Sequence, residues 1–219
     1  MITFSMFAAR MTMASLAPFA LAALLSACST VIRPDSATLY DLGPLRTSTS
    51  TSASTGAATG PALPALPPIS VAEIGVPNWL DRPTIFYRLE YVNGQQPRPY
   101  TQARWTMPPA QLLEQHLKVR IAQAGGAVLS PSDGANYVPV LRIEVDTFIQ
   151  SFTSPEQSTG KVGMRASVFK GRSLLAQRSF NREAPAPSAD ADGGVRALAA
   201  ASDAMIVDTM MWLGTLDLK

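Results

Sequence analysis

One segment of the chain gathers acidic, basic and aromatic side chains closely enough to suggest chemistry. Residues 78–88 read NWLDRPTIFYR, and Asp81 and Arg82 lie between a Trp and a Tyr. A carboxylate and a guanidinium beside aromatic rings could form an acid–base site. However, Pro77 and Pro83 bracket the first half of the segment, and Asp in a turn commonly accepts backbone N–H bonds. The pattern therefore favours a turn that leads into a strand.

The same segment also has a docking interpretation, which stays open beside that of a purely structural turn. Trp and Arg are among the residue types enriched at binding hot spots. Arg88 lies farther along the same segment than Arg82, and we expect both to project toward one side of the domain. The candidate partner-docking residues are Trp79, Asp81, Arg82, Arg88 and Trp105.

The rest of the chain offers few groups for catalysis. It holds 1 His and 1 Cys, which leaves no Cys/His metal site and no His-based triad beyond His116. Glu144 and Asp146 lie on a predicted outward strand face opposite Lys161 and Arg165, a pattern typical of cross-strand charge pairs. The chain has no nucleophile elbow and no phosphate loop. We therefore expect no enzymatic activity, no cofactor and no metal.

Cys28 has a chemistry of its own. It follows the apolar run of residues 14–25, which is shorter than the roughly 20 residues that span a bilayer and is typical of a cleaved secretory signal. The run ends in LSAC, which resembles the bacterial lipobox, where cleavage precedes the Cys and its sulfur is acylated, as with palmitate. We expect a signal peptide at 1–27 and a lipid-anchored tether at 28–37. The alternative is a Cys that closes a transmembrane or buried helix.

The residue after the Cys and the overall charge bear on location. In the sorting rule for bacterial lipoproteins, Asp after the Cys retains the protein at the inner membrane, so Ser29 favours the outer membrane. We expect the inner leaflet of that membrane, with the domain facing the periplasm. The formal net charge is only +2, so the chain lacks the basic footprint of nucleic-acid binding.

Hydrophobic periodicity predicts one α/β (α+β) domain over 38–219. It should hold a mixed, largely antiparallel sheet with two main helices packed on it. The last three strands should form an antiparallel meander with a charged outer face. The Ser/Thr/Ala/Pro-rich insertion at 46–68 should be disordered. Strands are expected at 38–42, 69–76, 84–92, 138–152, 161–170 and 174–183.

The two strongest turn and helix signals lie in the first half of the domain. Asn93-Gly94 predicts a two-residue hairpin turn after the strand at 84–92. The return arm contains Pro97 and Pro99, so we expect it to be an edge strand or irregular. A helix is expected from 108 to 124, because prolines suit the first turn and Gly-Gly follows the last one.

The final helix, expected at 195–216, is apolar on nearly all sides. Such a helix should be covered on both faces. It could be buried under the insertion or the first helix. Alternatively, it could form a subunit contact through Val207, Met211 and Trp212, since Met adapts well to interfaces.

The order of these features resembles the ABC-type transport auxiliary lipoprotein family, which includes paraquat-inducible protein C. The resemblance rests on the lipobox, on LYDL at 39–42, on VPNWLDRPTIFYR at 76–88, and on Tyr100 and Arg104-Trp105 ahead of a helix with L-x-x-x-L. It covers the chain from residue 38 to 219 apart from the insertion, and its specific part is 76–117.

The resemblance implies a mixed α/β fold and a role in envelope lipid transport. Family members accompany transporters of the mammalian-cell-entry (MCE) type, in which an inner-membrane ATPase and permease feed a periplasmic MCE protein. The auxiliary lipoprotein would dock the far end of that protein at the outer membrane, and we expect it to form a homo-oligomer through its last helix. Two rivals are an outer-membrane assembly lipoprotein that supports a β-barrel and a periplasmic lipid carrier.

Overall fold

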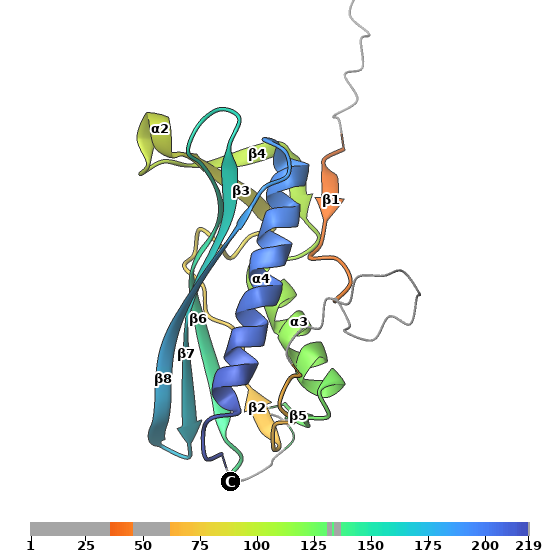
Figure 1. Ribbon diagram of the computed structural model, residues 1–219, viewed down its shortest axis with the longest axis vertical. Helices are drawn as coiled ribbons and strands as arrows, with labels where there is room; N and C mark the ends of the chain where they lie inside the picture. The colour runs from red at the N-terminus through yellow and green to blue at the C-terminus, as the bar shows by residue number, and fades with distance from the viewer. Residues whose placement is uncertain (1–35, 46–61, 131–132, 134–136, 219) are drawn as a thin grey trace, which may run out of the picture. The chain divides into compact units, whose positions relative to one another are not determined.

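Strand β6 (Val140–Phe152) organises the sheet in the computed structural model, which describes residues 36–45, 62–130, 133 and 137–218 (Figure 1). On one edge β6 pairs antiparallel with β7 (Ser158–Lys170), which pairs in turn with β8 (Ser173–Pro185). Its other edge pairs in parallel with two short strands, β2 (Ile69–Val71) at its start and β3 (Thr84–Leu89) at its end.

Three further strands complete an open, mixed sheet of eight strands. Strand β5 (Val128–Leu129) lies parallel to β2, β4 (Pro97–Trp105) lies antiparallel to β3, and β1 (Thr38–Tyr40) lies parallel to β4. The long pairings are antiparallel, and each parallel pairing covers only two or three residue pairs. This confirms the expected mixed α+β domain.

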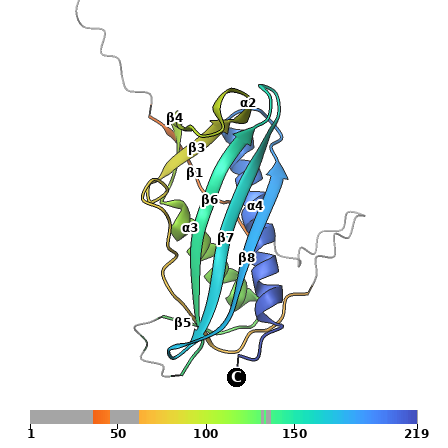
Figure 2. The same cartoon turned by 90° about the vertical axis from the view of Figure 1, so that its left-hand side faces the viewer.

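The meander of β6, β7 and β8 has one covered face and one solvent face. Alternation along 161–170 predicts that Val162, Met164, Ala166 and Val168 face inward, and all four are buried. The outer face is charged, and Arg165 forms an ion pair with Glu144 across the β6–β7 register, as the sequence predicts. Figure 2 shows the meander in front with the helices behind it.

A β-bulge in β6 changes which side chains face the core. The β6–β7 register shifts between Val145 and Thr147, and a bulge inserts one residue that reverses the alternation beyond it. Phe148 and Gln150 are therefore buried, at 2% and 0% exposure. Strict alternation along 138–152 predicts that Gln150 faces solvent together with Glu144 and Asp146, and the bulge makes that prediction wrong.

Helix α4 (Ala191–Leu213) starts four residues before the predicted boundary at 195. Asp190 caps it by accepting a 2.8 Å hydrogen bond from the Gly193 N–H. Gly193 and Gly194 lie inside the helix because the space beside them is filled: a Cβ on Gly194 would lie 2.0 Å from Gln150 Oε1. Close packing, and not a loop, explains this Gly-Gly pair.

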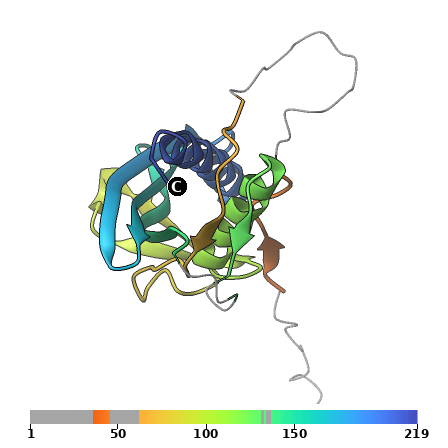
Figure 3. The same cartoon turned by 90° about the horizontal axis from the view of Figure 1, so that it is seen from below.

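Helix α3 (Pro109–Gln123) confirms the first predicted helix. Gly125 follows it with φ +81°, a conformation that favours Gly after a helix end. Arg120 Nη2 donates to Asp203 Oδ1 of α4 at 2.7 Å, which joins the two helices. Both helices lie on the same side of the meander, as Figure 3 shows.

The connection between β3 and β4 differs from the prediction. The short helix α2 (Glu90–Asn93) stands where the strand was expected to continue into a two-residue turn, and Tyr91 is exposed. Strand β4 becomes an inner strand where β1 pairs with its end, and its register with β3 shifts between Thr84 and Phe86, so the strand is irregular there, as expected. Pro97 and Pro99 lie in the half that β1 does not cover.

Part of the predicted insertion belongs to the domain. Residues 46–61 lie outside the described residues, as do the expected signal peptide and Cys28. Residues 62–68 have no regular structure, but Leu66 is buried and Leu63 packs against the core. The apolar residues between the prolines of this stretch therefore cover the core.

Candidate docking site

The segment NWLDRPTIFYR contains a closed turn followed by a strand. The Leu80 N–H donates to the Pro77 carbonyl at 2.8 Å, and Leu80 is buried. Trp79 is half-buried and meets Phe86 edge to face, with ring centroids 5.3 Å apart. Asp81 and Arg82 are exposed, and among the described residues no hydrogen bond to the Asp81 carboxylate is found. The expected turn is present, but its Asp does not cap it.

The structure does not gather the five predicted docking residues into one patch. Trp105 is only 1% exposed and packs edge to face on Phe148, with centroids 5.6 Å apart, so it belongs to the core. Arg82 and Arg88 lie near opposite ends of β3, which puts about 20 Å of extended chain between them. The exposed remainder is the turn itself, with Asp81 and Arg82.

A charged cluster joins α2 to the meander. Glu90 Oε1 accepts from Lys161 Nζ at 3.0 Å and also from the Ser151 hydroxyl. The Ser151 hydrogen bond, and then that of Lys161, lowers the pKa of Glu90. A lowered pKa keeps this carboxyl ionised at neutral pH, so it acts as an acceptor that holds α2 in place.

Gln150 is the centre of a buried polar network at the start of α4. Its Nε2 donates to Ser158 Oγ at 2.8 Å and to the Asp190 carbonyl at 3.1 Å, and its Oε1 accepts from the Tyr100 hydroxyl at 2.9 Å. Burial raises the pKa of Tyr100. The network is satisfied internally and fixes α4 against β6.

The only His of the chain, His116, is half-buried on α3. Burial lowers its pKa, although Asp203 and Asp41 act in the opposite direction. Within the described residues, no group of three or more His, Cys, Asp or Glu side chains could hold a metal ion. In the same part of the chain, no helix is both long and apolar enough to cross a membrane.

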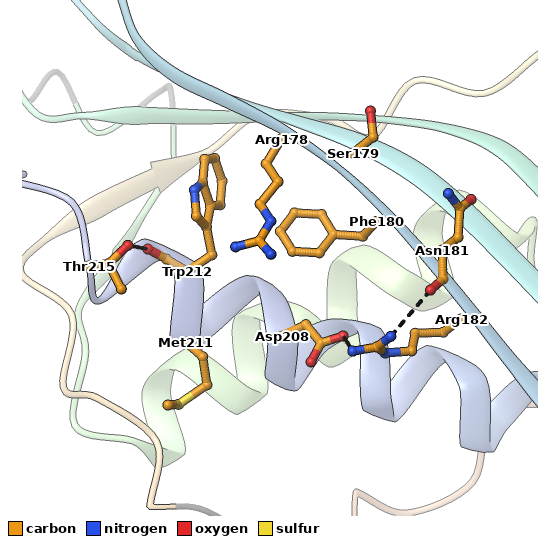
Figure 4. Close-up of a pocket in the computed structure, with 9 residues that line it drawn as sticks. All are labelled: Arg178, Ser179, Phe180, Asn181, Arg182, Asp208, Met211, Trp212 and Thr215. Carbon is orange, nitrogen blue, oxygen red and sulfur yellow. Dashed lines mark hydrogen bonds and ion pairs between the residues drawn. The ribbon is translucent and has the colours of Figure 1, made fainter.

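A groove of about 380 Å³ opens between β8 and the C-terminal half of α4 (Figure 4). Its volume falls in the range of roughly 300–1,000 Å³ typical of ligand pockets. Five consecutive residues of β8 line one side, and residues one helical turn apart line the other. The lining residues are Arg178, Ser179, Phe180, Asn181, Arg182, Asp208, Met211, Trp212 and Thr215.

An aromatic pair joins the two sides of the groove. Phe180 and Trp212 meet edge to face with centroids 5.7 Å apart, and both are buried, at 6% and 8% exposure. Trp212, one of the predicted subunit contacts, therefore packs within its own domain. Met211 is 42% exposed and Val207 is half-buried, so these two alone of the predicted set reach the surface.

The charges at the groove leave one cation uncompensated. Arg182 forms an ion pair with Asp208. Arg178 is exposed, lies over the Phe180 ring at 5.3 Å, and has no acidic partner among the described residues. These β8 residues are not among those predicted from the sequence. Their signal is the alternation of Arg178, Phe180 and Arg182, which places all three on the face toward α4.

The described residues thus form an open α+β sheet covered by two helices, with a surface groove beside β8. The chain belongs to the family of ABC-type transport auxiliary lipoprotein components, whose model matches residues 45–208. The family is one of lipoproteins that assist a transporter. It therefore implies a transporter partner and an envelope location, and it favours a non-catalytic role.

Solved structures share the fold. Protein XCC0632 from Xanthomonas campestris is 21% identical, with a TM-score of 0.62 over 71% of this chain and 88% of that chain. Another structure, of an uncharacterized protein, is 15% identical, with a TM-score of 0.59 over 81% of this chain and 99% of that chain. At such identities the likeness shows the fold alone. Comparison with curated proteins gives no match.

Proposed function

We propose that this chain is the non-catalytic docking subunit of an MCE-type ABC lipid transport system. Lipid on Cys28 would hold it at the inner leaflet of the outer membrane, where the domain faces the periplasm and receives the periplasmic MCE protein. The observation that carries the proposal is the match to the transport auxiliary lipoprotein family over residues 45–208.

The tether supports this arrangement on physical grounds. The acyl chains of a lipoprotein each contribute about 0.8 kcal/mol per buried CH₂ group, so several chains anchor it firmly. Residues 28–37 reach at most about 35 Å when fully extended. The domain would therefore work close to the membrane surface, where it can meet a protein that bridges the periplasm.

The turn at 78–82 is a proposed contact with the partner. Its exposed residues are Asp81 and Arg82, with Trp79 half-buried beside them. The alternative is a purely structural turn. If Trp79→Ala and Arg82→Ala leave both folding and partner binding unchanged, the turn is structural.

The docking function is tested by co-purification. The full-length lipoprotein, tagged at its C-terminus and extracted in mild detergent, should retain the periplasmic MCE subunit in near-stoichiometric amount. A variant that carries residues 29–219 behind a cleavable secretory signal without the Cys has no lipid, serves as the control for attachment and should leave the membrane fraction.

Two results would contradict the proposal. Recovery of an outer-membrane β-barrel in place of the MCE subunit would favour an assembly role. A lipid bound to the purified domain in stoichiometric amount, with no protein partner, would favour a carrier. Mass spectrometry of the extracted proteins and lipids distinguishes these outcomes.

A further inference from the structure

Strand β8 forms an open edge of the sheet. Within the described part of the chain it pairs with β7 alone, and it is thirteen residues long. An edge strand presents a row of unpaired N–H and C=O groups, which is a template for pairing with another chain. The groove lies along part of this edge.

The register identifies which backbone groups face the groove. The Ala186 N–H donates to the Ser158 carbonyl of β7 at 2.9 Å, and the β7–β8 register runs without a shift from Pro185 back to Ala176. Because antiparallel pairs alternate between bonded and non-bonded positions, the odd-numbered residues of β8 direct their backbone groups to the open side. Ser179 and Asn181 are therefore the groove-facing donors and acceptors.

The position of Arg182 agrees with this assignment. Its Nη1 donates to the Asn181 carbonyl at 3.5 Å (Figure 4), a long bond that leaves most of the capacity of that carbonyl unused. Both Ser179 and Asn181 line the groove. The groove thus combines directional backbone groups with the apolar Phe180–Trp212 pair and the cation of Arg178.

The size of the groove fits a short length of extended chain. An extended residue in a sheet occupies about 160 Å³, from spacings of about 3.3, 4.8 and 10 Å. The groove therefore holds roughly two such residues. Beyond it, β8 continues with Leu174 and Leu175, which are 51% and 43% exposed and can contact further residues of the same segment.

We propose that this groove binds an extended segment of the partner polypeptide, which pairs with the open edge of β8. An apolar side chain of the segment would rest on Phe180 and Trp212, and a carboxylate would meet Arg178. Strand addition of this kind takes affinity from main-chain bonds and specificity from alternate side chains. The identity of the partner rests on the proposed docking function, whereas the mode of binding rests on the groove.

Hydrogen exchange tests the mode of binding. We expect the full-length lipoprotein in detergent to gain amide protection over residues 174–183 when the periplasmic portion of the MCE subunit is added. Ser179→Pro removes one groove-facing N–H, a change that an edge strand tolerates. It should weaken binding about tenfold or more, whereas Ser179→Ala keeps the N–H and should bind normally.

A charge variant tests the cation. Arg178→Glu should also weaken binding about tenfold or more, because it repels an acidic segment. Arg142→Glu is the matched control. Arg142 of β6 lies over the Phe169 ring, 5.1 Å from its centroid, in the same way that Arg178 lies over the Phe180 ring. The peptide TVEVTVE is a second probe, beside the MCE subunit. The wild-type lipoprotein should bind it more tightly than TVKVTVK, and the Ser179→Pro variant should not bind it.

The outcomes separate the two proposals. If the MCE subunit binds Ser179→Pro and the wild type equally, the groove proposal fails and the docking function stands. If the wild type binds TVEVTVE but not the MCE subunit, the groove stands and the docking function fails. Protection of the β8 amides by phosphatidylglycerol vesicles would overturn the groove proposal in favour of lipid binding. Protection that appears when the concentration of the lipoprotein alone is raised would overturn it in favour of binding to a second copy.

Discussion

Asp190 concentrates several interactions at one end of α4. Its carboxylate accepts from the Gly193 N–H and from the Ser188 hydroxyl at 2.7 Å, and its carbonyl accepts from Gln150. The Gly193 N–H bond, and then that of Ser188, lowers the pKa of Asp190. Its stabilising contribution is therefore present above the usual pKa of Asp and is lost as the pH falls through the lowered value in the folded protein.

Replacing this cap should reduce stability. Asp190→Ala should lower the free energy of unfolding by about 1 kcal/mol, the usual cost of losing a helix N-cap, with the loss seen in urea denaturation at pH 7. Asp190→Asn should retain most of the stability, because Asn also caps well.

Asp192 is a matched control two residues away. It pairs with Arg196 on the exposed side of the same helix, and such pairs contribute only about 0.3–0.5 kcal/mol. If Asp190→Ala and Asp192→Ala lower the free energy of unfolding equally, the cap contributes no more to stability than a surface charge does.

At the scale of elements, α4 lies directly against β7. A Cβ on Gly160 of β7 would lie 2.5 Å from the Leu198 backbone N and 2.6 Å from the Ala197 carbonyl carbon. Both are backbone atoms, so only a shift of the whole helix could relieve the clash. The contact between α4 and the meander therefore depends on Gly at this position.

Gly160→Ala should destabilise the domain by roughly 1–3 kcal/mol, the usual cost of overpacking. We expect a loss near the upper end of this range, because backbone atoms cannot repack as side chains do. Thermal denaturation followed by circular dichroism measures the effect. Gly94→Ala is the control, since Gly94 has nothing within 4 Å of an added Cβ and no positive φ. A Gly160→Ala variant as stable as Gly94→Ala would contradict this packing argument.

The meander and helix α4 together create the groove. The open edge of β8 exists because no further described strand pairs with it, and α4 runs beside it because Gly160 and Gly194 allow close approach. The docking surface is thus a product of element packing, and no single short motif encodes it.

At the scale of the whole molecule, self-association through α4 stays a prediction. Because Trp212 is buried, the surface of α4 that could mediate self-association is limited to Val207, Met211 and their neighbours. We expect the purified chain without residues 1–28 to associate with rising concentration in light scattering, and Met211→Glu to weaken this association.

Val119→Glu provides a matched control on α3, because Val119 and Met211 are each 42% exposed on a helix. It should leave association unchanged. A monomer at all concentrations would remove self-association from the proposed function without affecting the docking of the MCE protein.

The amino-acid sequence alone determined the features that arise from local pattern. Alternation along 161–170 predicted a buried face that the structure contains, and Pro and Gly placed both ends of α3 correctly. The Glu144–Arg165 pair followed from the register of neighbouring strands. Such features depend on residues that are near in sequence or directly opposite in a hairpin.

The tertiary structure decided what depends on distant packing. A bulge turned Gln150 inward, close approach of α4 to β6 and β7 explained Gly194 and Gly160, and core packing buried Trp105 and Trp212. The groove required Arg178 and Met211, more than thirty residues apart, to meet across two elements. Periodicity reports which side of an element a residue occupies, but only packing decides what covers that side.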